Sequence, residues 1–236
     1  MPIAGKGSRF VKAGITTPKP LIEIKGKPMI KWATDSLPFL LNHKIIFILR
    51  KDHAEEHKLD QKLKDLYKDV QIDFVYTDGV KDGAASDVLL AEDLINTDED
   101  IAIYNTDQYF SCDLEEQIKT RGHEVQGIIP VFYATHPKWS FAKVNDEGYV
   151  TEVKEKDPIS DHATVGLYYF SHGSDYVWGA KQMIQKNIRV NNEYYVCPVY
   201  NELLARGDKV ILSHSDFMWG LGTPEDVEIF NKDFKG

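Results

Sequence analysis

AGKGSRFVKAGITTPKPLIEI, residues 4–24, combines small residues with a high density of positive charge. Between Ala4 and Ser8 the only long side chain is Lys6, so the backbone there can approach a phosphate closely and direct its N–H groups at it. Arg9 adds a guanidinium that binds phosphate oxygens in a bidentate manner. The spacing matches neither a P-loop nor a dinucleotide-binding fingerprint. The segment therefore predicts a phosphate-binding loop of another type.

Pro18-Lys19-Pro20 closes the same segment. Two prolines restrict the backbone on both sides of Lys19, so the direction of its side chain is largely set in advance. Phosphoryl-group chemistry depends mainly on positioning and on neutralising negative charge, and a cation held in one place serves both. Lys19 is therefore predicted to be a fixed cation of the kind that this chemistry needs.

The positive charge is concentrated at the start of an acidic chain of 236 residues with a net charge of −9. Residues 1–31 carry seven Lys and Arg against one acidic residue. Such a distribution favours a small phosphorylated ligand over a nucleic acid, which we exclude as a partner. No apolar run is long enough to span a membrane. Two widely spaced cysteines are typical of packed thiols in the reducing cytoplasm.

Short β-rich runs alternate with helical patterns in the first part of the chain. Strands are expected at 44–50, 71–77, 100–107 and 125–134, and helices from Pro28, over 52–66 and over 83–95. This order predicts an α/β fold, a Rossmann-like three-layer α/β/α domain with a mainly parallel mixed sheet.

The pattern changes after residue 135. A hairpin is expected around 145–148, with a strand at 162–170 and a further strand at 209–215. Helices are expected from a capping Ser174, over 193–207 ending at Gly207, and from a capping Thr223 followed by Pro224. We expect one domain, 1–236, with an inserted β-hairpin region, a nucleotide-binding half over 1–110 and an acceptor-binding half over 111–236.

These motifs resemble those of the sugar-1-phosphate nucleotidyltransferases, which join a nucleoside triphosphate to a sugar 1-phosphate. The family pattern is G-x-G-[ST]-R followed by P-K-P, and both parts occur here in order. The similarity extends through six further stretches and so covers nearly the whole chain: KDGAASDVLLA (81–91), NTDQYF (105–110), EVKEKDPIS (152–160), ATVGLYYF (163–170), EYYVCPVYNELLARG (193–207) and WGLGTPEDVEIF (219–230). Within the family the chain resembles the small members found with capsule and surface-polysaccharide genes. The resemblance implies the nucleotide-diphospho-sugar transferase fold, a cytoplasmic enzyme and release of pyrophosphate.

The resemblance also implies a role for each matching residue. Arg9 and Lys19 would be the catalytic cations, and Asp107 would bind Mg²⁺. The acceptor would contact Glu155, Lys156 and Gly166, with Lys156 on its phosphate. The nucleotide would lie against Ala4, Gly5, Lys6, Gly7, Ser8, Gly83 and Ala84.

Two departures from the family pattern stand out. Only Met1, Pro2 and Ile3 precede Ala4, where the family has a full strand, so either the first strand is short or residues are missing ahead of this numbering. Gly220 stands where the family often has an aspartate that serves as the second metal ligand. Water, Asp216 or Asp226 are the alternatives for completing the metal shell.

Several alternatives remain open from the sequence. A cytidylyltransferase acting on an alditol, amino-acid or choline phosphate shares the same chemistry. A glycosyltransferase of similar fold is less favoured, because Arg9 and Lys19 would have no triphosphate to bind. A non-catalytic nucleotide sensor is less favoured, because Arg9, Lys19 and Asp107 are all present. Trp139 and Trp219 are expected either to stack on a ligand or to pack. The closing helix is a candidate for a homo-oligomer contact.

Overall fold

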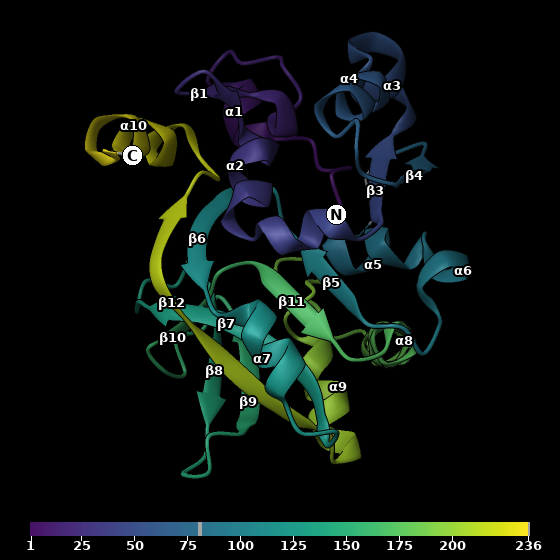
Figure 1. The fold of residues 1–236 in the computed structure, drawn as a ribbon, viewed down its shortest axis with the longest axis vertical. Coiled ribbons are helices and arrows are strands. Elements are labelled where there is room, and N and C mark those ends of the chain that lie inside the picture. The colour runs from purple at the N-terminus through teal and green to yellow at the C-terminus, as the bar shows by residue number, and fades with distance from the viewer. Residues whose placement is uncertain (80–81, 236) are drawn as a thin grey trace. The chain divides into compact units, whose positions relative to one another are not determined.

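Residues 1–79 and 82–235 are described by a computed structural model, in which the chain forms two compact units (Figure 1). Unit 1 comprises Met1–Val80, Asn105–Ser111 and Phe217–Gly236, and unit 2 comprises Lys81–Tyr104 and Cys112–Asp216. The units do not coincide with a division at residue 110, because the chain crosses between them several times. The segment 81–91, quoted above for its similarity, begins outside the described residues.

Unit 1 contains most of the N-terminal helices and the closing helix. Its helices are α1 (Ser8–Lys12), α2 (Met29–Ser36), α3 (Lys51–His57), α4 (Leu59–Leu66) and α10 (Pro224–Asp233), with short 3₁₀ turns at Lys19–Leu21 and Pro38–Asn42. Its strands are β1 (Glu23–Ile24), β2 (Lys27–Pro28), β3 (Ile45–Arg50) and β4 (Ile72–Thr77). Strands β6 (Gln108–Cys112) and β12 (Lys209–Gly220) pair with each other, and each has residues in both units.

The N-terminal residues of unit 1 are attached to strand β3. The N–H of Ile3 donates to the carbonyl of Ile48 at 2.8 Å, and Pro2 pairs with Ile48 in a parallel bridge. On the other side β3 pairs in parallel with β4. The residues before Ala4 thus pair with β3 through a bridge at Pro2, and the chain continues from there into the Gly5–Ser8 loop.

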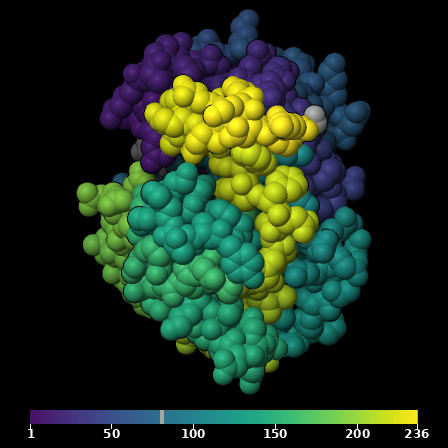
Figure 2. Space-filling model, turned by 90° about the vertical axis from the view of Figure 1, so that its left-hand side faces the viewer, coloured from purple at the N-terminus to yellow at the C-terminus, as the bar shows by residue number. Residues whose placement is uncertain are grey.

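The closing helix α10 is held against the N-terminal segment by aromatic packing. Phe230 is fully buried and lies edge-on to Trp32 of α2, with 4.9 Å between the ring centroids. Phe10 of α1 belongs to the same apolar cluster. Figure 2 shows the yellow closing helix lying over the purple N-terminal residues. Residues more than 200 positions apart in the sequence thus build one core in unit 1.

Unit 2 is built on a mixed sheet with the strand order β5-β11-β7-β10-β8-β9 and with β12 beside β7. These strands are β5 (Ile101–Tyr104), β7 (Val125–Tyr133), β8 (Ser140–Val144), β9 (Val150–Glu155), β10 (His162–Thr164) and β11 (Leu167–Phe170). Its helices are α5 (Ala84–Leu89), α6 (Glu92–Ile95), α7 (Leu114–Thr120), α8 (Gly173–Gln185) and α9 (Val199–Arg206).

Helices cover both faces of the unit 2 sheet, as neighbouring residues of β11 show. Phe170 stacks on Tyr200 of α9 at 4.4 Å between ring centroids, whereas Tyr169 lies under Arg121 at the end of α7. Adjacent residues of a strand point to opposite faces, so α9 and Arg121 lie on opposite faces of the sheet. The layered α/β arrangement expected from the sequence is confirmed.

The relative direction of neighbouring strands differs from the expectation of mainly parallel pairing. Among the strand pairs whose register the structure describes, β3 with β4 and β7 with β12 are parallel, and the others are antiparallel. The β8–β9 hairpin is confirmed, and with β10 and β11 it contributes the antiparallel pairs. The fold is therefore mixed α/β, with a larger antiparallel share than the alternating pattern indicated.

Several element boundaries were predicted wrongly, each for a local reason. The helix expected over 52–66 is two helices separated at Lys58, which has a φ of 53°. The strand over 162–170 is interrupted at Gly166, with a φ of 85°. The helix over 193–207 begins only at Val199, because Pro198 cannot continue a helix in the N-terminal direction. Ser174 lies inside the first turn of α8, since the N–H of Gly173 and that of Ser174 donate to the 97–99 turn.

Other local predictions are confirmed. Gly207 ends α9 in the left-handed conformation, and the Thr223 hydroxyl accepts a hydrogen bond from the N–H of Asp226 at the start of α10. Cys112 and Cys197 are free thiols. Trp219 lies edge-on to Phe230 and Trp139 edge-on to Phe132, while stacking of either ring on a ligand stays a prediction.

Candidate active site

The loop that precedes α1 takes its shape from Gly7. Gly7 is the N-cap of α1 and has a φ of 58° and a ψ of 34°, a left-handed conformation that side chains with a Cβ adopt at a cost. A Cβ added at Gly7 would lie 3.3 Å from the Cβ of Lys19, so the loop and the Pro-Lys-Pro segment touch here. The first N–H groups of a helix have no partner within it, and those of α1 are preceded by this bare loop.

Gly5 differs from Gly7 in its surroundings. A Cβ added at Gly5 would meet no atom within 4 Å, and Gly5 is exposed. Neither packing nor a left-handed φ therefore accounts for a glycine at this position. A space left open in front of a loop with bare backbone is what close approach of a ligand needs.

Lys19 is held between its prolines as the sequence predicts. Pro18 has an extended ψ of 132° and caps the 3₁₀ turn that Lys19 begins, and Pro20 is buried. The ammonium of Lys19 donates to Oδ2 of Asp107 at 2.5 Å, and both side chains are about a fifth exposed, 24% and 19%. Two residues 88 positions apart, selected separately from the sequence, are thus direct partners.

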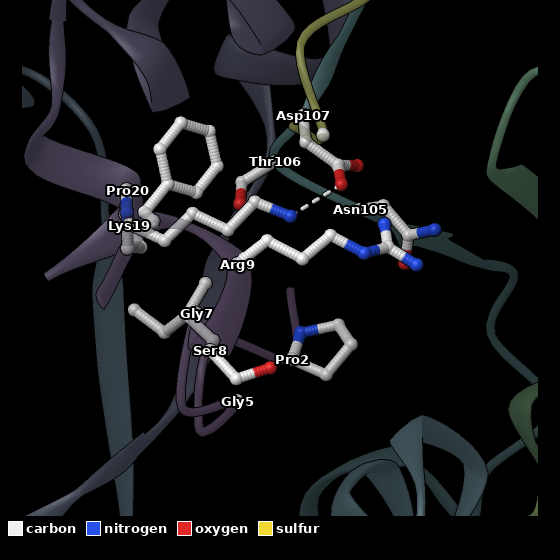
Figure 3. A pocket seen from close by; sticks show the side chains of 13 residues that line it. Pro2, Gly5, Gly7, Ser8, Arg9, Lys19, Pro20, Asn105, Thr106 and Asp107 are labelled. Atoms are coloured by element: carbon white, nitrogen blue, oxygen red, sulfur yellow. Dashed lines mark hydrogen bonds and ion pairs between the residues drawn. The ribbon is translucent and has the colours of Figure 1, made fainter. Parts of the chain in front are cut away.

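A cavity of about 330 Å³ in unit 1 brings these features together (Figure 3). The predicted residues Gly5, Gly7, Ser8, Arg9, Lys19 and Asp107 all line it. In Figure 3 the side chain of Arg9 extends past the Lys19–Asp107 pair toward Asn105. The cavity therefore presents two cations and one carboxylate around bare backbone, which fits an anion accompanied by a metal ion.

Four of the predicted nucleotide-binding residues are not part of this lining: Gly83 and Ala84, which belong to unit 2, and Ala4 and Lys6 of the loop itself. Ala4 is fully buried, and Lys6 is exposed. Ala4 follows the residues that pair with β3, so its small side chain serves packing. Residues that the sequence reasoning missed also line the cavity: Pro2, Ile3, Phe10, Pro20, Asn105, Thr106 and Gly222. Asn105 and Thr106 directly precede Asp107, and their polar side chains after a strand were an available signal.

The carboxylate of Asp107 has one oxygen that the protein does not use. Oδ1 of Asp107 is buried and has no hydrogen-bond partner among the described residues, whereas Oδ2 binds Lys19. A buried carboxylate oxygen without a donor is destabilising unless something else binds it. Mg²⁺ prefers carboxylate oxygens and commonly uses only one or two of them, with phosphates and water as further ligands. The residues at this site therefore fit Mg²⁺.

The glycine that faces Asp107 is Gly222. The N–H of Leu221 donates to the carbonyl of Asp107 at 2.7 Å, and a Cβ added at Gly222 would lie 3.0 Å from Oδ2 of Asp107. The same point is 3.9 Å from Oδ2 of Asp226 in the first turn of α10. Of the two side chains considered for completing a metal shell, unit 1 thus brings Asp226 toward Asp107, while Asp216 belongs to unit 2. In the described part of the chain no three His, Cys, Asp or Glu side chains form a metal-binding group.

Gly83 and Ala84 lie in unit 2, where Gly83 precedes α5 with a φ of 113°. A Cβ added at Gly83 would lie 2.5 Å from the carbonyl oxygen of Tyr194, and the N–H of Tyr194 donates to the carbonyl of Asp82. Close backbone packing therefore requires a glycine here. A contact of Gly83 and Ala84 with a base remains a prediction.

The three predicted acceptor-binding residues also lie in unit 2. Glu155 ends β9 and is 9% exposed, and its Oε2 accepts a short hydrogen bond from the hydroxyl of Ser140. Burial raises the pKa of Glu155, and the Ser140 hydrogen bond and the charge of Lys156 offset only part of that rise. Gly166 is buried between β10 and β11.

Lys156 follows β9 with a φ of 58°, which is uncommon for a residue with a side chain. Its ammonium donates to the hydroxyl of Tyr195 at 2.6 Å. The sequence reasoning did not single out Tyr195 or Ser140, because their partners come from other strands and loops.

No helix among the described residues has the length and apolar character needed to cross a membrane.

Known proteins resemble this chain over nearly its whole length. The family described as Nucleotidyl transferase matches residues 3–209. A UTP–glucose-1-phosphate uridylyltransferase, AglF, of Haloferax volcanii is 27% identical over 234 residues, which cover 94% of this chain and 90% of that protein. The crystal structure of a nucleoside-diphosphate-sugar pyrophosphorylase from Vibrio cholerae superimposes with a TM-score of 0.83 at 24% identity, covering 99% of this chain and 100% of that one. An inositol-1-phosphate CTP transferase from T. maritima gives a TM-score of 0.75 at 15% identity, covering 100% and 95%.

Proposed function

Because the chain belongs to the nucleotidyl transferase family, we propose that it transfers a nucleotidyl group from a nucleoside triphosphate to a sugar 1-phosphate. The products are pyrophosphate and a nucleotide sugar, which serves the synthesis of a surface polysaccharide such as a capsule. The observation that carries the proposal is that Arg9, Lys19 and Asp107 line one and the same cavity in unit 1. The similarity to a glucose-1-phosphate uridylyltransferase over 94% of the chain supports the choice of acceptor.

The reaction joins two anions, and the cavity residues address that difficulty. An oxygen of the acceptor phosphate attacks the α-phosphorus of the triphosphate, and the bond from this phosphorus to the β-phosphate oxygen breaks as pyrophosphate leaves. The acceptor phosphate is already a nucleophile, so no strong general base is needed. Lys19 neutralises charge on the phosphates, and Arg9 holds the triphosphate through its planar fork. The Gly5–Ser8 backbone lets the phosphates approach closely.

Mg²⁺ is part of this proposal. When bound it neutralises the triphosphate and the leaving pyrophosphate. Asp107 would hold it through the carboxylate oxygen that has no protein partner, and Asp226 is the side chain that fits the place of a second ligand. Lys19 would then exchange its hydrogen bond with Asp107 for phosphate oxygens.

In unit 2 we assign Gly83 and Ala84 to the base and the 155–156 pair to the acceptor. Glu155 is mostly buried, accepts a hydrogen bond from Ser140 and suits hydroxyl groups as donors. Lys156 carries a positive charge beside it and suits the acceptor phosphate. A polyol phosphate presents both hydroxyl groups for Glu155 and a phosphate for Lys156.

Pyrophosphate release tests the proposal. The purified protein is incubated with each of the four nucleoside triphosphates, Mg²⁺ and a panel of sugar 1-phosphates. We expect turnover with at least one pair, no turnover after chelation of the metal and recovery when Mg²⁺ is added back. Lys19→Met should lose most of this turnover. Absence of turnover across the panel would refute the sugar-phosphate proposal.

A second candidate is a cytidylyltransferase that acts on a non-sugar phosphate. It is favoured by Gly220, which departs from the aspartate expected of the sugar-phosphate enzymes. Alditol, amino-acid and choline phosphates with CTP therefore belong in the panel, and turnover confined to them would establish this candidate. Release of a sugar from a nucleotide sugar without pyrophosphate chemistry would instead indicate a glycosyltransferase.

A further inference from the structure

Lys156 occupies a backbone position that the surrounding structure holds in place. Its φ of 58° lies in the left-handed region, which a residue with a Cβ adopts only when neighbouring contacts compensate. Its N–H donates to the carbonyl of Trp139 at 2.9 Å, directly beside the paired residues Ser140 and Glu155 at the end of the β8–β9 hairpin. The hairpin thus sets where the Lys156 side chain begins.

The far end of the Lys156 side chain is held by Tyr195. The ammonium donates to the phenol oxygen at 2.6 Å and lies 4.6 Å from the centroid of the same ring. In the described part of the chain, the ammonium of Lys156 has no carboxylate partner within ion-pair distance. The neighbouring Glu155 is turned into the protein, where its Oε2 binds Ser140.

A phenol partner has a different consequence from a carboxylate partner. A carboxylate would fix the ammonium and cancel most of its charge, whereas a neutral phenol fixes its direction and leaves the charge available to an anion. A long lysine side chain left in water would lose much rotational freedom on binding a phosphate. An ammonium already held by Tyr195 has lost part of that freedom beforehand.

We propose that Tyr195 is a positioning residue, which holds the ammonium of Lys156 ready for the phosphate of the acceptor. The inference rests on the proposed function, in which Lys156 contacts that phosphate. Tyr195 acts through Lys156 and therefore affects acceptor binding while leaving binding of the nucleoside triphosphate unchanged. It extends the acceptor site to the segment before α9, to a residue to which the sequence reasoning gave no role.

The test compares Tyr195→Phe with Tyr194→Phe in the pyrophosphate-release assay. The first variant removes only the hydroxyl that binds Lys156. The second removes the neighbouring hydroxyl, which bonds to Asn187 and is the matched control. A hydrogen bond that involves a charged group corresponds to a change of roughly tenfold. We expect Tyr195→Phe to raise the KM for the acceptor by roughly tenfold without changing the KM for the triphosphate, and Tyr194→Phe to change neither.

A double-variant comparison separates positioning from a structural effect. In a Lys156→Gln background, Tyr195→Phe should produce no further rise in the acceptor KM, because the ammonium that Tyr195 holds is gone. Thermal unfolding of all variants checks that they fold. An additive effect of the two substitutions, or an equal rise in both KM values, would overturn the inference. If the wild-type protein turns over and Tyr195→Phe leaves the acceptor KM unchanged, only the role of Tyr195 is refuted. If the wild-type protein is inactive across the panel, the proposed function is refuted as well.

Discussion

Replacing Asp107 by asparagine should separate the catalytic from the structural role of the Lys19–Asp107 pair. The substitution keeps the shape of the side chain and removes its charge. An exposed ion pair contributes about 0–1 kcal/mol, and breaking a fully buried one costs about 3–5 kcal/mol. With side chains 24% and 19% exposed, this pair lies between these limits. We expect the free energy of unfolding to fall by about 1–2 kcal/mol, which lowers Tm by roughly 3–7 °C.

The effect of Asp107→Asn on turnover should be larger. Removing a group that stabilises charge in the transition state raises the barrier by about 3–4 kcal/mol, a loss of about 10²- to 10³-fold in kcat. Asp107 both pairs with Lys19 and has the unpartnered Oδ1 proposed for Mg²⁺. The assay is pyrophosphate release at saturating substrates, combined with thermal unfolding of the same preparation.

Asp35→Asn provides the matched control. Asp35 binds Lys27 and Lys31, both at 2.7 Å, in unit 1 and is not among the residues that line the cavity. We expect a comparable loss of stability from this variant and an unchanged kcat. A kcat for Asp107→Asn within about threefold of wild type would refute the mechanism, since it would leave no room for a charge effect of the size stated.

Four further substitutions test the glycines and the buried carboxyl group. Gly5→Ala should leave Tm unchanged, because the added Cβ meets nothing within 4 Å, and it should raise the KM for the triphosphate. Gly7→Ala should lower the free energy of unfolding by about 1 kcal/mol, because Gly7 has a φ of 58°. An equal change in Tm for both would contradict this account. Gly83→Ala should lower Tm more than Gly7→Ala does, because its Cβ would lie 2.5 Å from the Tyr194 carbonyl oxygen, and circular-dichroism melting measures the difference. Glu155→Gln should gain in Tm relative to wild type as the pH rises above 4.5, the ordinary pKa of a glutamate, and should show no gain below it. The reason is that burial raises the pKa of Glu155 in the folded state, so that its ionisation destabilises the wild-type fold only at higher pH. A difference in Tm between Glu155→Gln and wild type that does not change with pH would refute this.

The local signals in the sequence determined the parts of the fold that depend on neighbouring residues. The strands at 45–50 and 72–77, the β8–β9 hairpin and the cap of α10 follow from short patterns and are confirmed. Gly7 and the Pro18–Pro20 segment likewise act through their own backbone restrictions. The family resemblance also selected Arg9, Lys19 and Asp107, and all three line one cavity in the structure.

Only the tertiary structure decided which distant residues meet. The pairing of Lys19 with Asp107, the approach of Gly222 to that carboxylate and the hold of Tyr195 on Lys156 join residues from separate segments. The larger antiparallel share of the sheet and the assignment of residues 217–236 to unit 1 are likewise long-range outcomes. Local propensity extends over a few residues, whereas these contacts form when the apolar faces of different segments are buried together, and no short pattern encodes the partner.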